Sequence, residues 1–315
     1  MNRKDVLDLD DFSTDEINLV LENADAMKEI LSRPIKRVPA LRGTTVVNMF
    51  YEASTRTRVS FELAAKNLSA DVVNITASGS SVAKGESLID TIVTLQALGA
   101  DAIVMRHPEA GAPYLVARHL RGSVLNAGDG CHAHPTQALL DAYTIRERFG
   151  FVAGLRVVIV GDILHSRVAR SNVWCLTRLG AEVTLAGPPT LLPPSSDSGA
   201  SGSGLPPVQY SYDLDNAIKG ADVVMALRLQ KERQQGGLLP SLREYVQLYQ
   251  INRARLSQAA PNVLLMHPGP INEGIELAPE VAYGPQSVVA DQVTNGVAIR
   301  MSLLYLLLGE RGGGA

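Results

Sequence analysis

The chain has 315 residues, which at roughly 150 residues per domain suggests two domains. Hydrophobic residues make up 46% and charged residues 19%, a globular composition that excludes a disordered chain, a coiled coil and a collagen-like repeat. The 29 Lys and Arg against 32 Asp and Glu give a net charge of −3, so no basic excess is available for nucleic acid or for a membrane surface.

The sequence also carries signals about the compartment. Two cysteines, Cys131 and Cys175, exclude a disulfide framework and fit a reducing compartment. The first eleven residues are too charged for a signal peptide, and the densest apolar run near the end, Leu303–Leu308, is far shorter than the ~18 residues that span a bilayer. We therefore expect a cytoplasmic enzyme without a membrane segment.

Strand-like and helix-like segments alternate along the chain. The first half is predicted to contain, in order, a helix after Ser13, a strand over Thr44–Phe50, a helix over Thr57–Leu68, a strand over Val72–Thr76, a helix over Leu88–Leu98, a strand over Ala102–Met105 and a helix over Pro135–Phe149. The second half is predicted to contain strands over Leu155–Val160, Glu182–Leu185, Asp222–Leu227 and Val263–Met266, and helices over Val168–Leu179 and Val293–Leu308. This alternation predicts an α/β fold with parallel, doubly wound sheets flanked by helices.

A domain boundary is expected near Phe149–Ala153, which gives domains over 1–149 and 150–292. Pro193–Pro207 consists almost wholly of Pro, Ser and Gly, and this composition predicts a flexible surface loop without chemistry.

The first polar cluster is Ser54-Thr55-Arg56-Thr57-Arg58, between the Thr44–Phe50 strand and the next helix. Ligands of parallel sheets bind beyond the carboxyl ends of the strands, and a helix N-terminus with hydroxyls and a guanidinium suits a phosphate. A Ser or Thr N-cap followed by solvated arginines explains the same residues, and spacing alone does not decide between the two.

The second cluster is His134-Pro135-Thr136-Gln137. Proline fits the first helical position, which places His134 as the cap and Gln137 one turn inside the helix. A capping histidine without chemistry is the simpler alternative. A zinc site built from Asp129, Cys131, His132 and His134 is disfavoured, because the spacing matches no usual ligand pattern.

The third cluster, Gly161 to Arg167, follows the Leu155–Val160 strand. A dinucleotide-binding turn has three glycines here, but Ile163 and Ser166 occupy the second and third positions, which weakens a nicotinamide role. Arg167 suits bidentate binding of a carboxylate. Four further segments are candidates of the same kind: Ser80–Glu86, Met105–Pro108, Leu227–Gln230 and His267–Pro270.

Basic residues thus follow several strands in both halves, with hardly any acid beside them. A single segment of this kind more often has a structural role than a functional one. Together they indicate a site for a small, multiply anionic substrate.

At this point the motifs resemble one family. Phe50 to Arg58 is similar to the signature of the aspartate and ornithine carbamoyltransferases, and Lys84-Gly85-Glu86, Met105-Arg106-His107 and His134-Pro135-Thr136-Gln137 match in order and approximate spacing. The resemblance covers about residues 4–309. It implies a carbamoyl-phosphate-binding domain over 1–149, an aspartate-binding domain over 150–292 and a C-terminal helix over 293–315 that packs back on the first domain.

The resemblance favours the aspartate branch. Arg228 to Arg233 is similar to that branch's aspartate-binding stretch, and Pro268 stands where the ornithine branch typically has cysteine. The implied reaction transfers the carbamoyl group of carbamoyl phosphate to the α-amino group of L-aspartate, the committed step of de novo pyrimidine biosynthesis.

The roles of individual residues follow only from the resemblance. The implied catalytic residues are Thr55, Arg56, Lys84, Arg106 and His134. Carbamoyl phosphate would be bound by Ser54, Thr55, Arg56, Thr57, Arg106, His134, Gln137, Gly269 and Pro270. Aspartate would be bound by Lys84, Arg167, Arg228 and Gln230. Ser81 and Lys84 would reach in from a neighbouring subunit of a homotrimer, and no metal or cofactor is implied.

Three other interpretations compete with this one. They are a carbamoyltransferase for another amine such as ornithine, a non-catalytic scaffold subunit, and a two-domain anion-binding protein. Arginines would repel the side-chain ammonium of ornithine, and the full basic set argues against lost catalysis. The sequence leaves open whether a regulatory chain or a dihydroorotase binds.

Overall fold

The computed structural model of the chain describes residues 1–76, 86–193, 204–230 and 241–309. The chain forms two compact units, one made of Met1–Leu140 with Val293–Ala315 and the other of Asp141–Gln292. One unit contains a four-stranded sheet and the other a five-stranded sheet, and the paired strands of both sheets run parallel. The predicted class, α/β with two helix-flanked parallel sheets, is confirmed.

The first unit has strand order β2-β1-β3-β4. Its strands are β1 (Thr45–Phe50), β2 (Asp71–Thr76), β3 (Ala102–His107) and β4 (Ser123–Asp129). Its helices are α1 (Thr14–Ser32), α2 (Thr55–Asn67), α3 (Leu88–Ala97), α4 (Ala112–His119), the first part of α5 (Pro135–Phe149) and most of α11 (Val289–Leu308).

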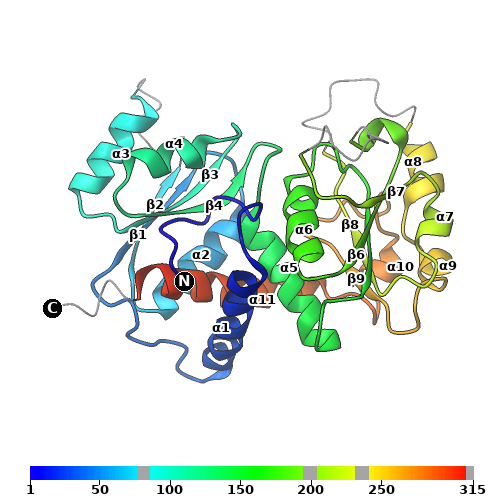
Figure 1. Ribbon diagram of the computed structural model, residues 1–315, viewed down its shortest axis with the longest axis horizontal. Helices are drawn as coiled ribbons and strands as arrows, with labels where there is room; N and C mark the ends of the chain where they lie inside the picture. The colour runs from blue at the N-terminus through cyan, green and yellow to red at the C-terminus, as the bar shows by residue number, and fades with distance from the viewer. Residues whose placement is uncertain (77–85, 194–203, 231–240, 310–315) are drawn as a thin grey trace. The chain divides into compact units, whose positions relative to one another are not determined.

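The C-terminal helix α11 packs on helix α1 of the first unit, which confirms the predicted return of this helix to the first domain. Figure 1 shows the red α11 beside the dark blue α1. Ser302 Oγ donates to the Val20 carbonyl at 2.8 Å, and Lys28 Nζ donates to Asn295 Oδ1 at 2.9 Å.

Helix α1 begins with a capping box, in which Ser13 and Glu16 each accept the other's backbone N–H. No helix among the described residues is long and apolar enough to cross a membrane.

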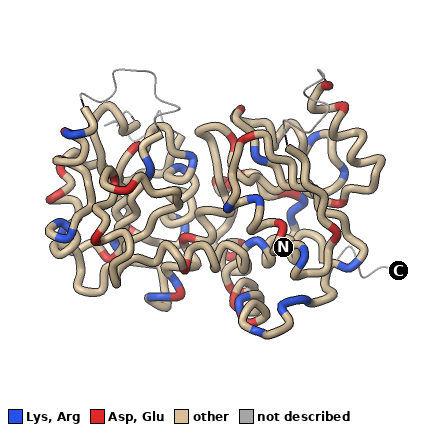
Figure 2. Tube along the Cα trace, turned by 180° about the vertical axis from the view of Figure 1, so that it is seen from behind, with Lys and Arg blue, Asp and Glu red and all other residues tan. Residues whose placement is uncertain are grey.

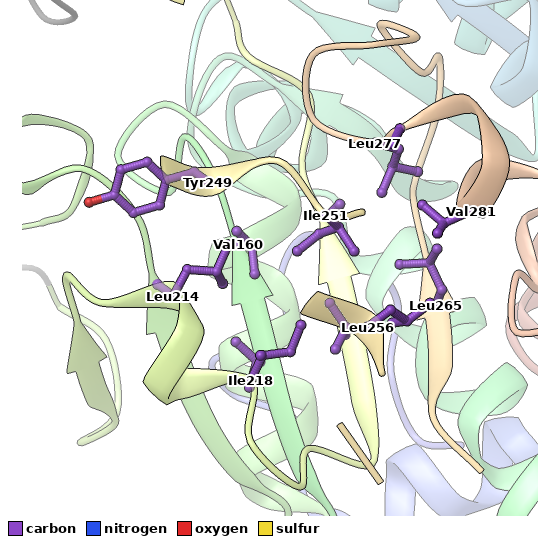
Figure 3. Packing of buried hydrophobic residues seen from close by; sticks show 14 of the residues in the cluster. Val160, Leu214, Ile218, Tyr249, Ile251, Leu256, Leu265, Leu277 and Val281 are labelled. Carbon is purple, nitrogen blue, oxygen red and sulfur yellow. The ribbon is translucent and has the colours of Figure 1, made fainter. Parts of the chain in front are cut away.

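The second unit has strand order β7-β6-β5-β8-β9. Its strands are β5 (Arg156–Val160), β6 (Glu182–Ala186), β7 (Gln209–Ser211), β8 (Val223–Ala226) and β9 (Leu264–Met266). Its helices are α6 (Arg167–Arg178), α7 (Leu214–Ala217), α8 (Leu242–Tyr249), α9 (Arg253–Leu256) and α10 (Pro279–Ala282), with a 3₁₀ turn over Pro189–Leu191. Figure 3 shows the apolar side chains that pack against one face of this sheet, among them Val160, Ile251 and Leu277.

The structure contains elements that the sequence patterns did not predict. Strands β4 and β7 and helices α4, α7, α8, α9 and α10 are all additional. The units divide between Leu140 and Asp141, inside α5, whereas a boundary after Phe149 was predicted. The second half of α5 groups with the second unit because Asp141 accepts hydrogen bonds from Asn172 and Gln292.

Most of the predicted loop over Pro193–Pro207 lies outside the described residues. Within the described remainder, Leu205 is buried. Pro193, the first residue of the segment, is buried as well, and both residues differ from the expectation of a surface loop.

Strand order decides which predicted segments come together. In the first unit, β1, β3 and β4 are adjacent in the sheet, so the segments that follow them start from neighbouring strands. In the second unit, β5, β8 and β9 are adjacent in the same way. Parallel strands end at one edge, so each trio of segments meets at a single sheet edge. Strand order also reverses between β1 and β3 and between β5 and β8, the place where open α/β sheets bind ligands.

Candidate active site

Helix α2 begins directly after β1 with a cluster of hydroxyls and arginines. Ser54 is its N-cap and makes no side-chain capping bond, and the first turn contains no acidic residue. Arginine near the positive end of a helix opposes the helix dipole, so this turn gains from a bound anion. Thr57 is buried, Thr55 is exposed, and the side chain of Arg56 is exposed but still partly shielded from solvent. The cluster therefore offers backbone N–H groups, hydroxyls and a cation at one sheet edge.

Arg56 is the residue of this cluster whose pKa departs from its ordinary value. Partial burial lowers the pKa of its guanidinium from the ordinary value, and no charged neighbour contributes to the shift. Among the residues that the structure describes, Arg56 has no ion-pair partner. A cation that has lost part of its hydration without gaining a carboxylate is suited to a phosphate.

Arg106, near the end of β3, lies beside β1, because the register pairs Phe50 with Arg106. One terminal nitrogen donates to Glu52 Oε1 at 2.5 Å and the other to the Ala127 carbonyl at 3.2 Å. The expectation that hardly any acid lies beside the basic residues is therefore wrong at Arg106. Glu52, which the sequence analysis gave no role, orients this arginine from the segment that follows β1.

His134 lies directly before α5, and the helix begins at Pro135, as predicted. The His134 carbonyl accepts the N–H groups of Gln137 and Ala138. His134, Thr136 and Gln137 are all buried. His134 and Gln137 therefore share the first turn of α5 at the edge formed by β1, β3 and β4.

The loop that leads to His134 is organised by Asp129. Its carboxylate accepts the backbone N–H groups of Gly111 and Ala133 and the side-chain N–H of Asn126, at 2.7, 3.1 and 2.8 Å. Burial alone would raise the pKa of Asp129, but hydrogen bonds from His132, Asn126 and Gly111 lower it on balance. In the described part of the chain, no group of three or more His, Cys, Asp or Glu side chains is arranged to hold a metal ion. Asp129 thus orders the loop.

In the second unit, Arg167 is the first residue of α6 and is buried. The N-cap Ser166 accepts the Ala169 N–H at 3.1 Å, and no acidic residue lies in the first turn. Asp162, fully buried, pairs with His165 at 2.8 Å between its Oδ1 and Nδ1. This pair, which the sequence analysis missed, fixes the turn that carries Arg167.

Gly161 is required by packing at this turn. Its φ is +129°, and a Cβ at this position would lie 3.0 Å from the Leu227 carbonyl oxygen. Only glycine fits such a conformation at such a close approach. Packing and backbone conformation therefore account for glycine at this position without a bound dinucleotide.

Arg228 and Gln230 follow β8 and are half-buried, while Leu229 between them packs in the core. Gly269 and Pro270 follow β9, and Gly269 has a φ of +66°. The structure thus brings Arg167, Arg228 and the 267–270 turn to one edge of the second sheet. Ser81 and Lys84 lie outside the described residues, as do Lys231 to Arg233.

The two units therefore define an α/β protein in which each sheet presents cationic and hydrogen-bonding groups suited to small anions at one edge. Acidic and basic residues are otherwise interspersed along the chain, as Figure 2 shows, in agreement with the net charge of −3.

Comparison with known proteins identifies the class. Residues 4–147 match the carbamoyl-phosphate-binding domain of the aspartate/ornithine carbamoyltransferases, and residues 153–307 match the Asp/Orn-binding domain of the same proteins. The chain belongs to the aspartate/ornithine carbamoyltransferase family.

Curated relatives are similar over almost their whole length. The chain is 64% identical over 308 residues to the aspartate carbamoyltransferase catalytic subunit of Roseiflexus sp. strain RS-1, covering 98% of this chain and 96% of the relative. It is 57% identical over 309 residues to that of Moorella thermoacetica, covering 98% of both.

Solved structures of both branches share the fold. Ornithine carbamoyltransferase from Pyrococcus furiosus has a TM-score of 0.85 at 31% identity, covering 99% of this chain and 98% of that one. Aspartate transcarbamoylase from Trypanosoma cruzi, in complex with carbamoyl phosphate and aspartate, has a TM-score of 0.85 at 31% identity, covering 96% of both chains. The fold alone therefore does not select the amine acceptor.

Proposed function

We propose that this chain transfers the carbamoyl group of carbamoyl phosphate to the α-amino group of L-aspartate, giving N-carbamoyl-L-aspartate and phosphate in pyrimidine biosynthesis. The observation that carries the choice of aspartate is the 64% identity, over 98% of the chain, to aspartate carbamoyltransferase catalytic subunits. Arg228 after β8 supports it, because a guanidinium binds a carboxylate and repels an ammonium.

The phosphate group binds at the start of α2 in this proposal. Ser54, Thr55 and Thr57 donate hydroxyl hydrogens, the first-turn N–H groups add backbone donors, and Arg56 supplies the charge. The cap without a side-chain bond and the partly desolvated arginine support this assignment.

The carbamoyl group is polarised by donors at the same edge. Arg106, His134 and Thr55 face the carbonyl oxygen and stabilise the negative charge that develops on it. Loss of one such donor typically raises a barrier by about 3–4 kcal/mol. The short contact with Glu52 supports a fixed orientation of Arg106.

The carbamoyl NH₂ group needs acceptors, which Gln137 and the backbone carbonyls around Gly269 and Pro270 provide. Aspartate is bound through its two carboxylates by Arg167 and Arg228, with Gln230 in support, and Lys84 interacts with both substrates. The α-amine, once deprotonated, attacks the carbamoyl carbon. The tetrahedral oxyanion then collapses, the C–O bond to phosphate breaks, and the leaving phosphate accepts the amine proton.

We also propose a cytoplasmic homotrimer whose active sites receive Ser81 and Lys84 from a neighbouring subunit. Exposed apolar side chains on α2, β2 and α3 support association through the first unit: Val59, Leu63, Val73, Ile89 and Val93. The two free cysteines, of which Cys175 is buried, support a reducing compartment.

A shared site makes a complementation prediction. Hybrid trimers of inactive Lys84→Ala and Arg56→Ala chains should recover part of the activity, because some sites combine an intact Arg56 with an intact neighbouring Lys84. Hybrids of Arg56→Ala with Arg106→Ala serve as the control and should stay inactive, since both residues belong to one chain's own site. Absence of recovery in isolated, correctly assembled hybrids would contradict the shared site.

The proposed reaction is tested by phosphate release. Release from carbamoyl phosphate by the purified chain should depend on L-aspartate and saturate with it. Phosphate release at the same rate with and without L-aspartate would indicate hydrolysis of carbamoyl phosphate and overturn the proposal.

A further inference from the structure

A buried histidine–glutamate pair lies beneath the turn that follows β9. His267 begins this turn and Glu276 lies in the segment before α10. The side chains are 0% and 1% exposed, respectively. The sequence predicted His267–Pro270 as a candidate segment without a role for His267 itself, and it gave no indication of Glu276. The proposed reaction uses neither side chain directly.

One oxygen of Glu276 contacts both ends of the turn. Its Oε1 lies 3.2 Å from His267 Nε2 and accepts the backbone N–H of Asn272 at 2.5 Å. Residues 267–272 are therefore held at their first and last members by a single carboxylate oxygen.

The second nitrogen of His267 fixes the tautomer. Nδ1 lies 2.8 Å from the backbone nitrogen of Gly269, and a backbone N–H can only donate. Nδ1 must therefore be the acceptor, so the ring proton of neutral His267 is on Nε2, which faces Glu276. The carboxylate thus favours the tautomer in which His267 holds Gly269.

This contact sets the direction of a carbonyl. The Gly269 N–H and the Pro268 C=O belong to one planar trans peptide unit and point in opposite directions. When Gly269 N–H is bound to the His267 ring, the Pro268 oxygen is directed away from the buried ring. The hydrogen bond of Asn272 N–H to Glu276 constrains the Ile271 carbonyl in the same way.

The pair itself rests on a rigid support. The backbone of Glu276 accepts the Ile251 N–H at 3.0 Å, and the next side chain, Leu277, is buried among Ile251 and Val281 in the core that Figure 3 shows. His267 N–H donates to Gln292 Oε1 at 3.0 Å, and Gln292 Nε2 donates to Asp141 at 2.7 Å. Both partners are therefore held in place independently of the turn.

We propose that Glu276 is a positioning residue for the carbamoyl group, acting through the tautomer of His267 to aim the backbone carbonyls of the 267–270 turn. This inference rests on the proposed function, in which those carbonyls accept the carbamoyl NH₂. The bound phosphate is held by other residues, on α2. The pair therefore contributes to recognition of the carbamoyl group and not of phosphate.

Two variants of Glu276 separate this role from simple packing. Glu276→Leu fills the space without an acceptor and should lower kcat/KM for carbamoyl phosphate about tenfold, the loss expected for a hydrogen-bonded position. Competitive inhibition by inorganic phosphate should keep its wild-type constant. Glu276→Gln should stay within about threefold of wild type, because an amide oxygen still accepts from His267 and Asn272. Among the described residues, Oε2 has no hydrogen-bond partner, so its replacement by NH₂ breaks no hydrogen bond.

The matched control is Glu280→Leu, an exposed glutamate in the first turn of α10, which should behave as wild type. Wild-type kinetics in Glu276→Leu, or equal loss in the Leu and Gln variants, would overturn the positioning role. A parallel loss of phosphate inhibition would overturn it as well. If the wild-type chain itself shows no carbamoyl transfer, the proposed function fails instead, so the two failures are distinguishable.

His267 supplies a second test if Glu276→Leu does not fold. The His267→Asn variant retains an acceptor near the Nδ1 position, whereas the His267→Gln variant retains only a group near Nε2. His267→Asn should therefore keep more carbamoyl-phosphate affinity than His267→Gln, although glutamine is closer to histidine in length. The reverse order would contradict a role for the Gly269 contact.

Discussion

Replacing Arg56 with alanine is expected to lower kcat/KM for carbamoyl phosphate by about 150- to 800-fold, the largest effect that we predict. The magnitude follows from loss of a charge-assisted contact to a phosphate, worth about 3–4 kcal/mol where it also stabilises the transition state. Partial burial lowers the pKa of Arg56, and no acid in the described residues compensates it, so an anionic substrate is its natural partner. Steady-state kinetics at saturating aspartate measures the effect directly.

Lys66→Ala provides the control for Arg56→Ala. Lys66 is an exposed cation in the last turn of the same helix and pairs with Glu62 at 2.6 Å. Its loss should change kcat/KM by less than about twofold, as expected for an exposed ion pair. Equal effects of the two substitutions would mean that net charge, and not the start of α2, binds the phosphate.

Replacing Arg228 with alanine is expected to raise KM for L-aspartate by about a hundredfold and to leave the affinity for carbamoyl phosphate within about twofold of wild type. A hydrogen-bonded charge pair contributes about 1.5–3 kcal/mol, which corresponds to about 12- to 150-fold, and a half-buried guanidinium is expected near the upper end. Arg228→Lys should recover only part of the loss, because an ammonium cannot bind a carboxylate through two parallel hydrogen bonds. Initial rates against aspartate concentration give these values.

Lys219→Ala is the matched control for Arg228→Ala, since Lys219 is an exposed cation of the same unit. It should leave both Michaelis constants unchanged. If Arg228→Ala instead raises KM for carbamoyl phosphate and spares aspartate, the assignment of Arg228 to the acceptor is wrong.

The parallel sheets could be predicted from sequence because most of their strands are short apolar runs, and β1, β5 and β8 are buried and rich in β-branched residues. Seven strands were predicted within two residues of their observed ends. Strand β4 was not, because its sequence contains Asn126 and Asp129, which patterns assign to loops. Both are fully buried in the structure, where Asn126 donates to Asp129 and to the Leu7 carbonyl. Hydrogen bonds that satisfy buried polar groups cannot be read from composition.

The candidate site shows a similar division. Ser54, Arg106, His134, Arg167 and Arg228 could be located because each lies at the end of a predicted strand or the start of a helix. The residues that hold these side chains in place could not be located in this way. Whether Glu52 contacts Arg106 depends on the register of β1 with β3, and a one-residue shift would separate them.

The buried pair below the second edge was missed for a different reason. His267 and Glu276 are nine positions apart in an irregular segment, so no helical or strand period relates them. Their neighbouring glycine and prolines predicted a turn but not what holds it.

The most direct test of the proposed function is the identity of the product. The chain would be incubated with ¹³C-labelled carbamoyl phosphate and equal concentrations of L-aspartate and L-ornithine, and the products would be identified by NMR. We predict N-carbamoyl-L-aspartate as the labelled product, with the ¹³C-labelled carbamoyl carbon bonded to the α-nitrogen. Label found on the side-chain nitrogen of ornithine would contradict this prediction and would reassign Arg228.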